Sequence, residues 1–189
     1  CHPYCGKVVC YGCMLSCFFG SGKCPFCNAK LDTDEDITME RLKKRVEAND
    51  ANSITRLGSV NAMGSLGLQQ DHKRAFELWT RAAELGSSMA RFGLGRAYFE
   101  GLGVEKDAKK AIHHYELAAM AGHEVARYKL GFIEYEAGNI ERAIKHWMIS
   151  ASAGHSMSMK GIKRGFDQGE VNSDVYELTL KEYNDSCDA

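Results

Sequence analysis

The sequence is poor in proline, nearly neutral in net charge and free of long apolar stretches. Only 2 prolines stand against 19 glycines, which argues against a β-sandwich built on proline turns and favours helices that end at glycine. A formal net charge of -1 leaves no overall basic excess to attract nucleic acid or an anionic membrane. No segment approaches the run of about 20 apolar residues that a transmembrane helix needs. We therefore expect neither nucleic acid nor a membrane as a partner.

The residues that are present are typical of a folded protein. Hydrophobic residues make up 44% and charged residues 26% of the 189 residues, close to the averages of globular domains, which excludes wholesale disorder. At about 150 residues per domain, this length allows one domain with a small module, or two modest domains. Since the first residue is cysteine and not methionine, we expect the sequence to be a piece of a longer protein.

The 8 cysteines are concentrated at one end of the chain, with Cys187 lying apart. The others are Cys1, Cys5, Cys10, Cys13, Cys17, Cys24 and Cys27. A secreted disulfide framework would spread its cysteines through the fold, whereas Cys-x-x-Cys pairs packed at one end are typical of zinc ligation in a reducing compartment. We therefore predict a zinc-binding module at residues 1–30 and a cytoplasmic or nuclear location.

Two Cys-x-x-Cys pairs, Cys10 with Cys13 and Cys24 with Cys27, are the strongest metal-binding signal. Two thiolates three positions apart on a tight turn can both reach one zinc ion at the usual sulfur-to-zinc distance of about 2.3 Å. Two other interpretations remain open: a pair of disulfides, and a redox-active Cys-x-x-Cys, which lacks its usual βαβ surroundings here. Cys17 fits neither pair and is better explained as a small buried residue or a free thiol.

The cysteine pattern resembles the second half of a RING-type zinc finger. In that family two zinc ions are held in a cross-brace, with the first and third ligand pairs on one ion and the second and fourth pairs on the other. The resemblance implies that Cys10 and Cys13 are the third pair, that Cys24 and Cys27 are the fourth, and that Cys5 is the first member of the second pair.

The sequence departs from the RING family at several positions. The first ligand pair has no counterpart, and the family's usual histidine would fall on Lys7, a poor zinc ligand, so that Cys1 and His2 are the nearest substitutes. RING modules dock a ubiquitin-conjugating enzyme, and the resemblance thus implies a ubiquitin-protein ligase. Asn28 stands where many active members carry an arginine that contacts ubiquitin. The alternative is a non-enzymatic adaptor in which the zinc module is structural or only binds a partner.

From residue 50 onward, a pattern of small and aromatic residues recurs with periods of 36 and 32 residues. Its centre is Trp79, then Tyr115, then Trp147, each with alanine four positions before and after it and glycine seven positions after it. These spacings place the small and aromatic side chains on one face of a helix that ends at the glycine. A Leu-Gly pair between these segments marks another helix, so each unit is predicted to contain two short helices.

Two short helices cannot bury their own apolar face, so neighbouring units must stack. The predicted fold is therefore all-α, with an α-solenoid of helix-turn-helix repeats over residues 50–168. The Leu-Gly and Ala-Ala-x-x-Gly elements, together with the loop at Gly101–Asp107, resemble the Sel-1-like (SLR) repeat family, which is related to the tetratricopeptide repeats. The resemblance implies an interaction scaffold that binds a protein partner on the solenoid surface.

No catalytic motif is visible in the repeat region. The identical register of the three aromatic residues predicts that they belong to the core. The histidines are scattered, without the spacing of a catalytic metal site, and we expect them at the surface. Gly101 and Gly103 join two helices and lack the strand that a dinucleotide-binding loop requires.

The segments beside the repeats are predicted to be a leading and a closing helix. Residues 31–49 combine an acidic linker with a helix that carries Leu42 and Val46 four positions apart. Residues 169–189 contain an amphipathic capping helix with a predicted N-cap at Ser173–Asp174 and a tail with a free thiol at Cys187. The apolar residues expected to cover the end of the solenoid are Val175, Leu178, Leu180 and Tyr183.

Overall fold

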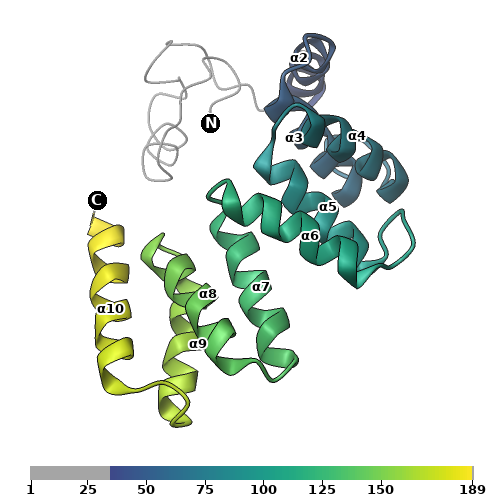
Figure 1. Ribbon diagram of the computed structural model, residues 1–189. Helices are drawn as coiled ribbons and strands as arrows, with labels where there is room; N and C mark the ends of the chain where they lie inside the picture. The colour runs from purple at the N-terminus through teal and green to yellow at the C-terminus, as the bar shows by residue number, and fades with distance from the viewer. Residues whose placement is uncertain (1–34, 189) are drawn as a thin grey trace.

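The computed structural model describes residues 35–188, and within this part the chain forms helices joined by short loops and no strand (Figure 1). The helices are α2 (Glu35–Glu47), α3 (Ala51–Met63), α4 (His72–Glu84), α5 (Ser88–Glu100), α6 (Ala108–Met120), α7 (Glu124–Glu136), α8 (Ile140–Ser152), α9 (Ser156–Asp167) and α10 (Ser173–Asp188). The predicted all-α class is thus confirmed for residues 35–188, whereas the predicted module at residues 1–30 lies outside them.

The helices are arranged as stacked hairpins. The most extensive contacts join α3 to α4, α5 to α6 and α7 to α8, and each of these hairpins then packs on the next through α4 with α5, α6 with α7 and α8 with α9. Helix α2 covers the first hairpin, and α10 packs on α8 and α9 at the other end. Figure 1 shows these elements as one curved row, which confirms the predicted solenoid.

Local signals explain where the second helices α4 and α6 begin and where the second helices of all three units end. The side chains of Asp71 and Asp107 accept hydrogen bonds from the backbone N–H three positions further on, at 2.8 and 3.0 Å, which satisfies a donor that the helix itself leaves unpaired. The glycines predicted to end these helices follow them with positive φ angles, and they are Gly86, Gly122 and Gly154.

The core of each unit is an aromatic ring surrounded by alanine and glycine. Trp79, Tyr115 and Trp147 are only 3%, 1% and 3% exposed, which confirms their predicted place in the core. The Leu-Gly pairs have a steric reason, because a Cβ atom at Gly95 or Gly131 would lie 2.6 Å from the ring of Tyr115 or Trp147. Glycine therefore lets the two helices of a unit approach closely over the aromatic ring.

The leading helix α2 joins the solenoid through its apolar side. Met39 and Leu42 are buried together with Val60 of α3, while Lys44 lies on the exposed side and pairs with Glu40 at 2.8 Å. The amphipathic pattern of the sequence thus agrees with the side of α2 that packs on the first unit.

The closing helix α10 begins at Ser173, but its N-cap is not the predicted Ser173–Asp174. Asn172 Oδ1 accepts the hydrogen bond from Val175 N at 2.9 Å, because the capping side chain must precede the amide it binds by two or three positions and asparagine is a strong N-cap residue. Val175 and Leu180 pack against the last core cluster as expected, whereas Leu178 is 51% exposed and does not cover it.

Candidate protein-interaction surface

The first helices of the units, α3, α5, α7 and α9, present a shared surface. A small residue, Ser53, Ala90, Ala126 or Ser158, is buried at the same repeat position of each helix. At 3.6 residues per turn, positions -1, +2, +3 and +6 counted from that residue lie within one arc of about 100°. We call the surface formed by these positions of the four helices the first-helix face.

The first-helix face contains a recess between α3 and α5. It holds about 440 Å³ of space open to solvent, and its lining consists of Ser59, Met63, Trp79, Met89, Phe92, Gly93 and Arg96. Trp79 belongs to α4 and is almost fully buried, so its indole forms the floor, while side chains of the two first helices form the walls.

A second recess lies between α7 and α9, two units further along. It holds about 500 Å³, and its lining consists of Tyr128, Phe132, Trp147, Met157, Lys160, Gly161 and Arg164. Four lining residues of the first recess, namely its tryptophan, methionine at position 89, glycine and arginine, recur here at one constant offset of 68 residues in the sequence. The two recesses are therefore the same structural element repeated.

Glycine lets the indole at the floor of each recess pack directly against a first helix. A Cβ atom at Gly93 would lie 2.8 Å from the Trp79 ring, and one at Gly161 would lie 3.1 Å from the Trp147 ring. In the unit between them, the equivalent position of α7 is Lys129. Glycine at positions 93 and 161 therefore lets each indole approach its first helix more closely than a larger residue would allow.

Cationic side chains border both recesses. The Arg96 guanidinium lies 5.8 Å from the centroid of the Trp79 ring, and its Nε is buried without a hydrogen-bond partner among residues 35–188. Arg164 lies 4.8 Å from the centroid of the Tyr135 ring. Within the part of the chain that the structure describes, no ion pair involves Arg96, Arg164 or the exposed Lys160.

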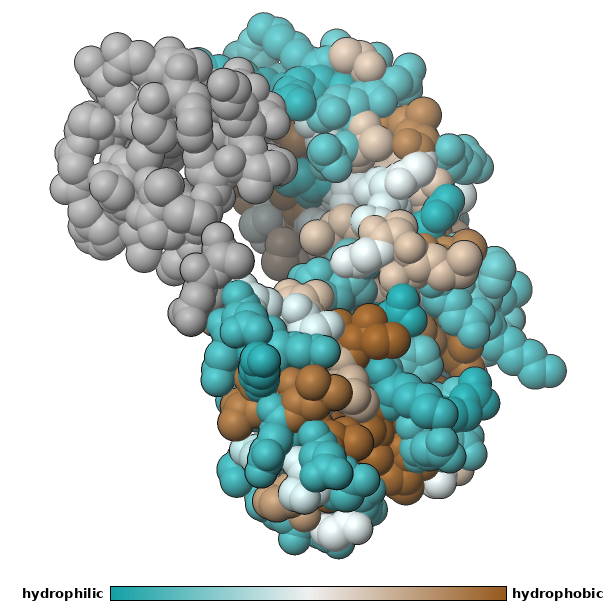
Figure 2. Space-filling model, turned by 60° about the vertical axis from the view of Figure 1, so that its left-hand side comes forward, coloured by the Kyte–Doolittle hydropathy of each residue, from teal (hydrophilic) through white to brown (hydrophobic). Residues whose placement is uncertain are grey.

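Large apolar side chains at the recesses are exposed to solvent. Met63, Met89, Phe132 and Met157 are 65%, 54%, 38% and 47% exposed. Figure 2 shows that hydrophobic side chains (brown) also reach the surface among polar ones (teal) in the part of the molecule formed by α7 to α10. Apolar residues gathered beside a concave feature in this way mark an interaction site more often than an inert surface, and methionine adapts its shape to different partners.

The comparison with protein families agrees with the repeat pattern. The Sel1 repeat matches the chain three times, at residues 51–87, 88–123 and 125–155. The chain belongs to the Sel1 repeat family. The three matches coincide with the hairpins α3–α4, α5–α6 and α7–α8, so the observed repeat unit is the family's unit.

Solved Sel1 repeat structures resemble this chain over most of its length. The Sel1 repeat protein from Oxalobacter formigenes is 28% identical with a TM-score of 0.68, and the match covers 84% of this chain and 65% of that protein. The protective antigen c5321 of uropathogenic Escherichia coli, described as displaying an SLR fold, is 26% identical with a TM-score of 0.65, covering 79% of this chain and 33% of that protein. The chain thus spans less than two thirds of either relative. No curated protein matches it.

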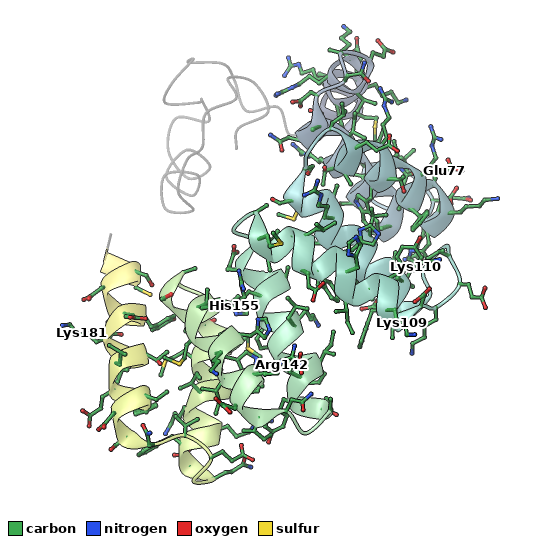
Figure 3. All side chains as sticks on the ribbon, viewed as in Figure 1. Glu77, Lys109, Lys110, Arg142, His155 and Lys181 are labelled. Carbon is green, nitrogen blue, oxygen red and sulfur yellow. The ribbon has the colours of Figure 1, made fainter. Side chains whose placement is uncertain are left out.

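Two histidines that we expected at the surface are instead built into the Sel1 repeat stack. His123 and His155 are the N-caps of α7 and α9, and the Nδ1 of each accepts a hydrogen bond from the backbone N–H three positions on, at 3.2 and 3.3 Å. The His123 ring stacks on Phe92 at 4.7 Å, and His155 lies 4.9 Å from the Tyr128 ring. Figure 3 shows His155 beside α7 and away from the outer edge of the molecule.

These caps require neutral imidazole, because a protonated Nδ1 cannot accept a hydrogen bond. The proton of His123 then resides on Nε2, which lies 3.3 Å from the Met89 sulfur at the first recess. Burial lowers the pKa of both histidines below the ordinary value, and the nearby Glu124 carboxylate opposes this effect only in part.

The two histidine caps should make the Sel1 solenoid less stable in mild acid. Because their folded-state pKa lies below the unfolded value of about 6.5, their contribution is complete above that pH and is lost as the pH falls through the folded-state pKa. We expect protonation of each cap to lower the free energy of unfolding of the protein by about 1 kcal/mol between about pH 7 and 5. Urea denaturation measures this change. In the double variant His123→Asn/His155→Asn, asparagine caps without titrating, so an unchanged pH slope would contradict this assignment.

The predicted zinc ligands of the chain lie outside the described residues: Cys5, Cys10, Cys13, Cys24 and Cys27, with Cys1 and His2 as substitutes. Within residues 35–188, no group of three or more His, Cys, Asp or Glu side chains could hold a metal ion. None of the helices of that same part is long and apolar enough to span a membrane. Cys187 is exposed near the end of α10 and forms no disulfide with another residue of the described part of the chain.

Proposed function

We propose that the chain is a protein-binding adaptor whose first-helix face holds a segment of another protein. The observation that carries this proposal is the pair of recesses with exposed methionine and phenylalanine at their edges. Contact of these apolar side chains with water is unfavourable, and a partner that covers them would remove it. Solenoids use extended surfaces of this kind to bind partners, and the preformed helices spare the ordering entropy that a flexible site would lose.

Site-specific photocrosslinking in cells tests this function. The photoreactive residue benzoylphenylalanine is placed at Phe132, at the second recess, or at Met120, which is 80% exposed on the second helix α6. We expect a discrete adduct with one partner protein from position 132 and none of that adduct from position 120. The same adducts from both positions, or none from either, would refute the adaptor function.

We further propose that residues 1–30 bind zinc as a RING-like module, with Cys5 and the pairs Cys10/Cys13 and Cys24/Cys27 as ligands. Closed zinc sites stabilise small modules that have little hydrophobic core of their own. The same cysteine spacing favours a second candidate function, a ubiquitin-protein ligase that docks a ubiquitin-conjugating enzyme. We place the adaptor first because it is supported by the recesses of the described residues, whereas the ligase interpretation rests on the cysteine spacing alone.

An autoubiquitination assay separates these two functions. The full-length protein is incubated with a panel of ubiquitin-conjugating enzymes, and Cys24→Ser serves as the control because it removes one proposed zinc ligand. Ubiquitin chains that form with the original protein and disappear with Cys24→Ser would establish the ligase. The adaptor function predicts no chains with any conjugating enzyme, together with bound zinc in the purified protein by elemental analysis.

A further inference from the structure

We propose that the segment held by the first-helix face is extended and acidic, and that it inserts one large apolar side chain into each of the two recesses. This inference rests on the proposed adaptor function and specifies the chemistry of its partner. Three observations support it: the lining of the recesses, the sign of the charge around them, and their repetition two units apart.

The lining of the recesses selects an apolar side chain. Each floor is a buried indole, and each wall includes a methionine that is about half exposed, Met89 in one recess and Met157 in the other. A leucine, methionine or phenylalanine side chain placed there would contact the indole floor and cover the exposed thioether. Gly93 and Gly161 add no side chain of their own to these linings.

The charge around the recesses selects an acidic segment. Of the sixteen positions that make up the first-helix face, five are cationic and none is acidic. The cations are Arg56, Arg96, Lys129, Lys160 and Arg164. Because the whole chain has a formal net charge of -1, this positive charge is a local property of the face, and carboxylates beside the inserted apolar side chains would complement it.

The repetition of the recess sets the spacing of the two apolar side chains. Each recess lies between the first helices of adjacent units, so the two recesses are two unit steps apart. Taking the 8–10 Å spacing of packed helices as the step from one unit to the next, we estimate a separation of roughly 20 Å. An extended chain rises about 3.3 Å per residue, so side chains about six positions apart can reach both recesses at once.

Binding of synthetic peptides to the whole chain tests this chemistry by fluorescence anisotropy. The probe is a fluorescein-labelled peptide of glutamate and serine that carries two leucines four, six or eight positions apart. At the best spacing, we expect about tenfold tighter binding than for the peptide with one leucine or with lysine in place of glutamate. Equal binding of the one- and two-leucine peptides would overturn the proposal. So would a single-stranded oligonucleotide of equal charge that binds as tightly as the best peptide.

Two matched pairs of variants locate the binding. Met157→Glu at the second recess should weaken binding of the best peptide about tenfold. Lys160→Glu should weaken it by a similar factor at low salt and by a smaller factor at high salt. The controls make the same changes elsewhere: Met120→Glu on α6, and Lys181→Glu on α10, where Figure 3 shows Lys181 projecting outward. All four positions are exposed, and circular dichroism verifies folding. Equal losses within each pair, or no loss at all, would overturn the proposal.

These outcomes are distinguishable from failure of the adaptor function. If position 132 crosslinks a partner in cells while no acidic two-leucine peptide binds, the proposed chemistry is wrong and the adaptor function stands. If neither position 132 nor any peptide shows binding, both are wrong.

Discussion

Replacing Trp79 with alanine should lower the free energy of unfolding by about 4 kcal/mol, the loss typical of a buried aromatic residue. Trp79 is 3% exposed, and a Cβ at either of two glycines, Gly58 or Gly93, would lie within 3 Å of its ring. Its indole N–H donates a hydrogen bond to the Thr55 carbonyl at 3.3 Å. Truncation therefore empties a tightly enclosed space and leaves that buried carbonyl without this donor.

Urea denaturation followed by circular dichroism measures this loss, and the melting temperature should fall by roughly 10 °C for a domain of this size. The control is Met120→Ala, since Met120 is 80% exposed and its truncation should change the stability by less than about 0.5 kcal/mol. A loss of under about 1 kcal/mol for Trp79→Ala would show that neighbouring units collapse into the space, and would contradict the rigid packing inferred from the glycines.

The repeat register explains why much of this fold could be predicted from the sequence. Trp79, Tyr115 and Trp147 recur with alanine and glycine at fixed spacings, and a residue that returns at the same place in stacked units must face the same neighbours. Helical periodicity then assigns the buried side of each helix. The all-α solenoid therefore followed from local pattern alone, without any knowledge of long-range contacts.

The recesses could not be predicted in the same way, because they are formed between units. Gly93 and Gly161 line them, but glycine does not occupy this position in the other first helices, where Arg56 and Lys129 stand. A search for features common to all units does not find a glycine that occurs in only two of the four first helices. The two glycines recur at every second unit. The meaning of that recurrence becomes clear only when the indole beneath each glycine is known.

The histidine caps were missed for a different reason, although the sequence contained a signal for them. Ser87, His123 and His155 each follow the glycine that ends a second helix, and serine is a common N-cap residue. Register alone could have assigned the same role to the histidines. The spacing of the histidines, in contrast, bears only on metal ligation and catalysis, and for those functions it is uninformative here.

Replacing Gly103 with alanine should lower the free energy of unfolding by about 3 kcal/mol, although Gly103 lies in an exposed loop. Its φ of +72° costs an L-residue about 1–2 kcal/mol. In addition, a Cβ atom there would overlap the backbone of His72 at the start of α4 and lie 2.6 Å from Lys73 N. The loop between α5 and α6 is thus pressed against the preceding unit, where Leu102 and Val104 pack on the first core cluster.

Gly122→Ala is the matched control, because Gly122 has a similar φ of +82° but no atom within 4 Å of the added Cβ. It should lose only the conformational cost of about 1–2 kcal/mol, so the difference between the two variants isolates the contact between loop and helix. Urea denaturation of both variants at one pH gives that difference. Equal losses of unfolding free energy in the two variants would mean that the loop between α5 and α6 moves away from α4 without cost. A larger loss for Gly103→Ala would show that the loop helps to hold the first and second units together, and with them the walls of the first recess.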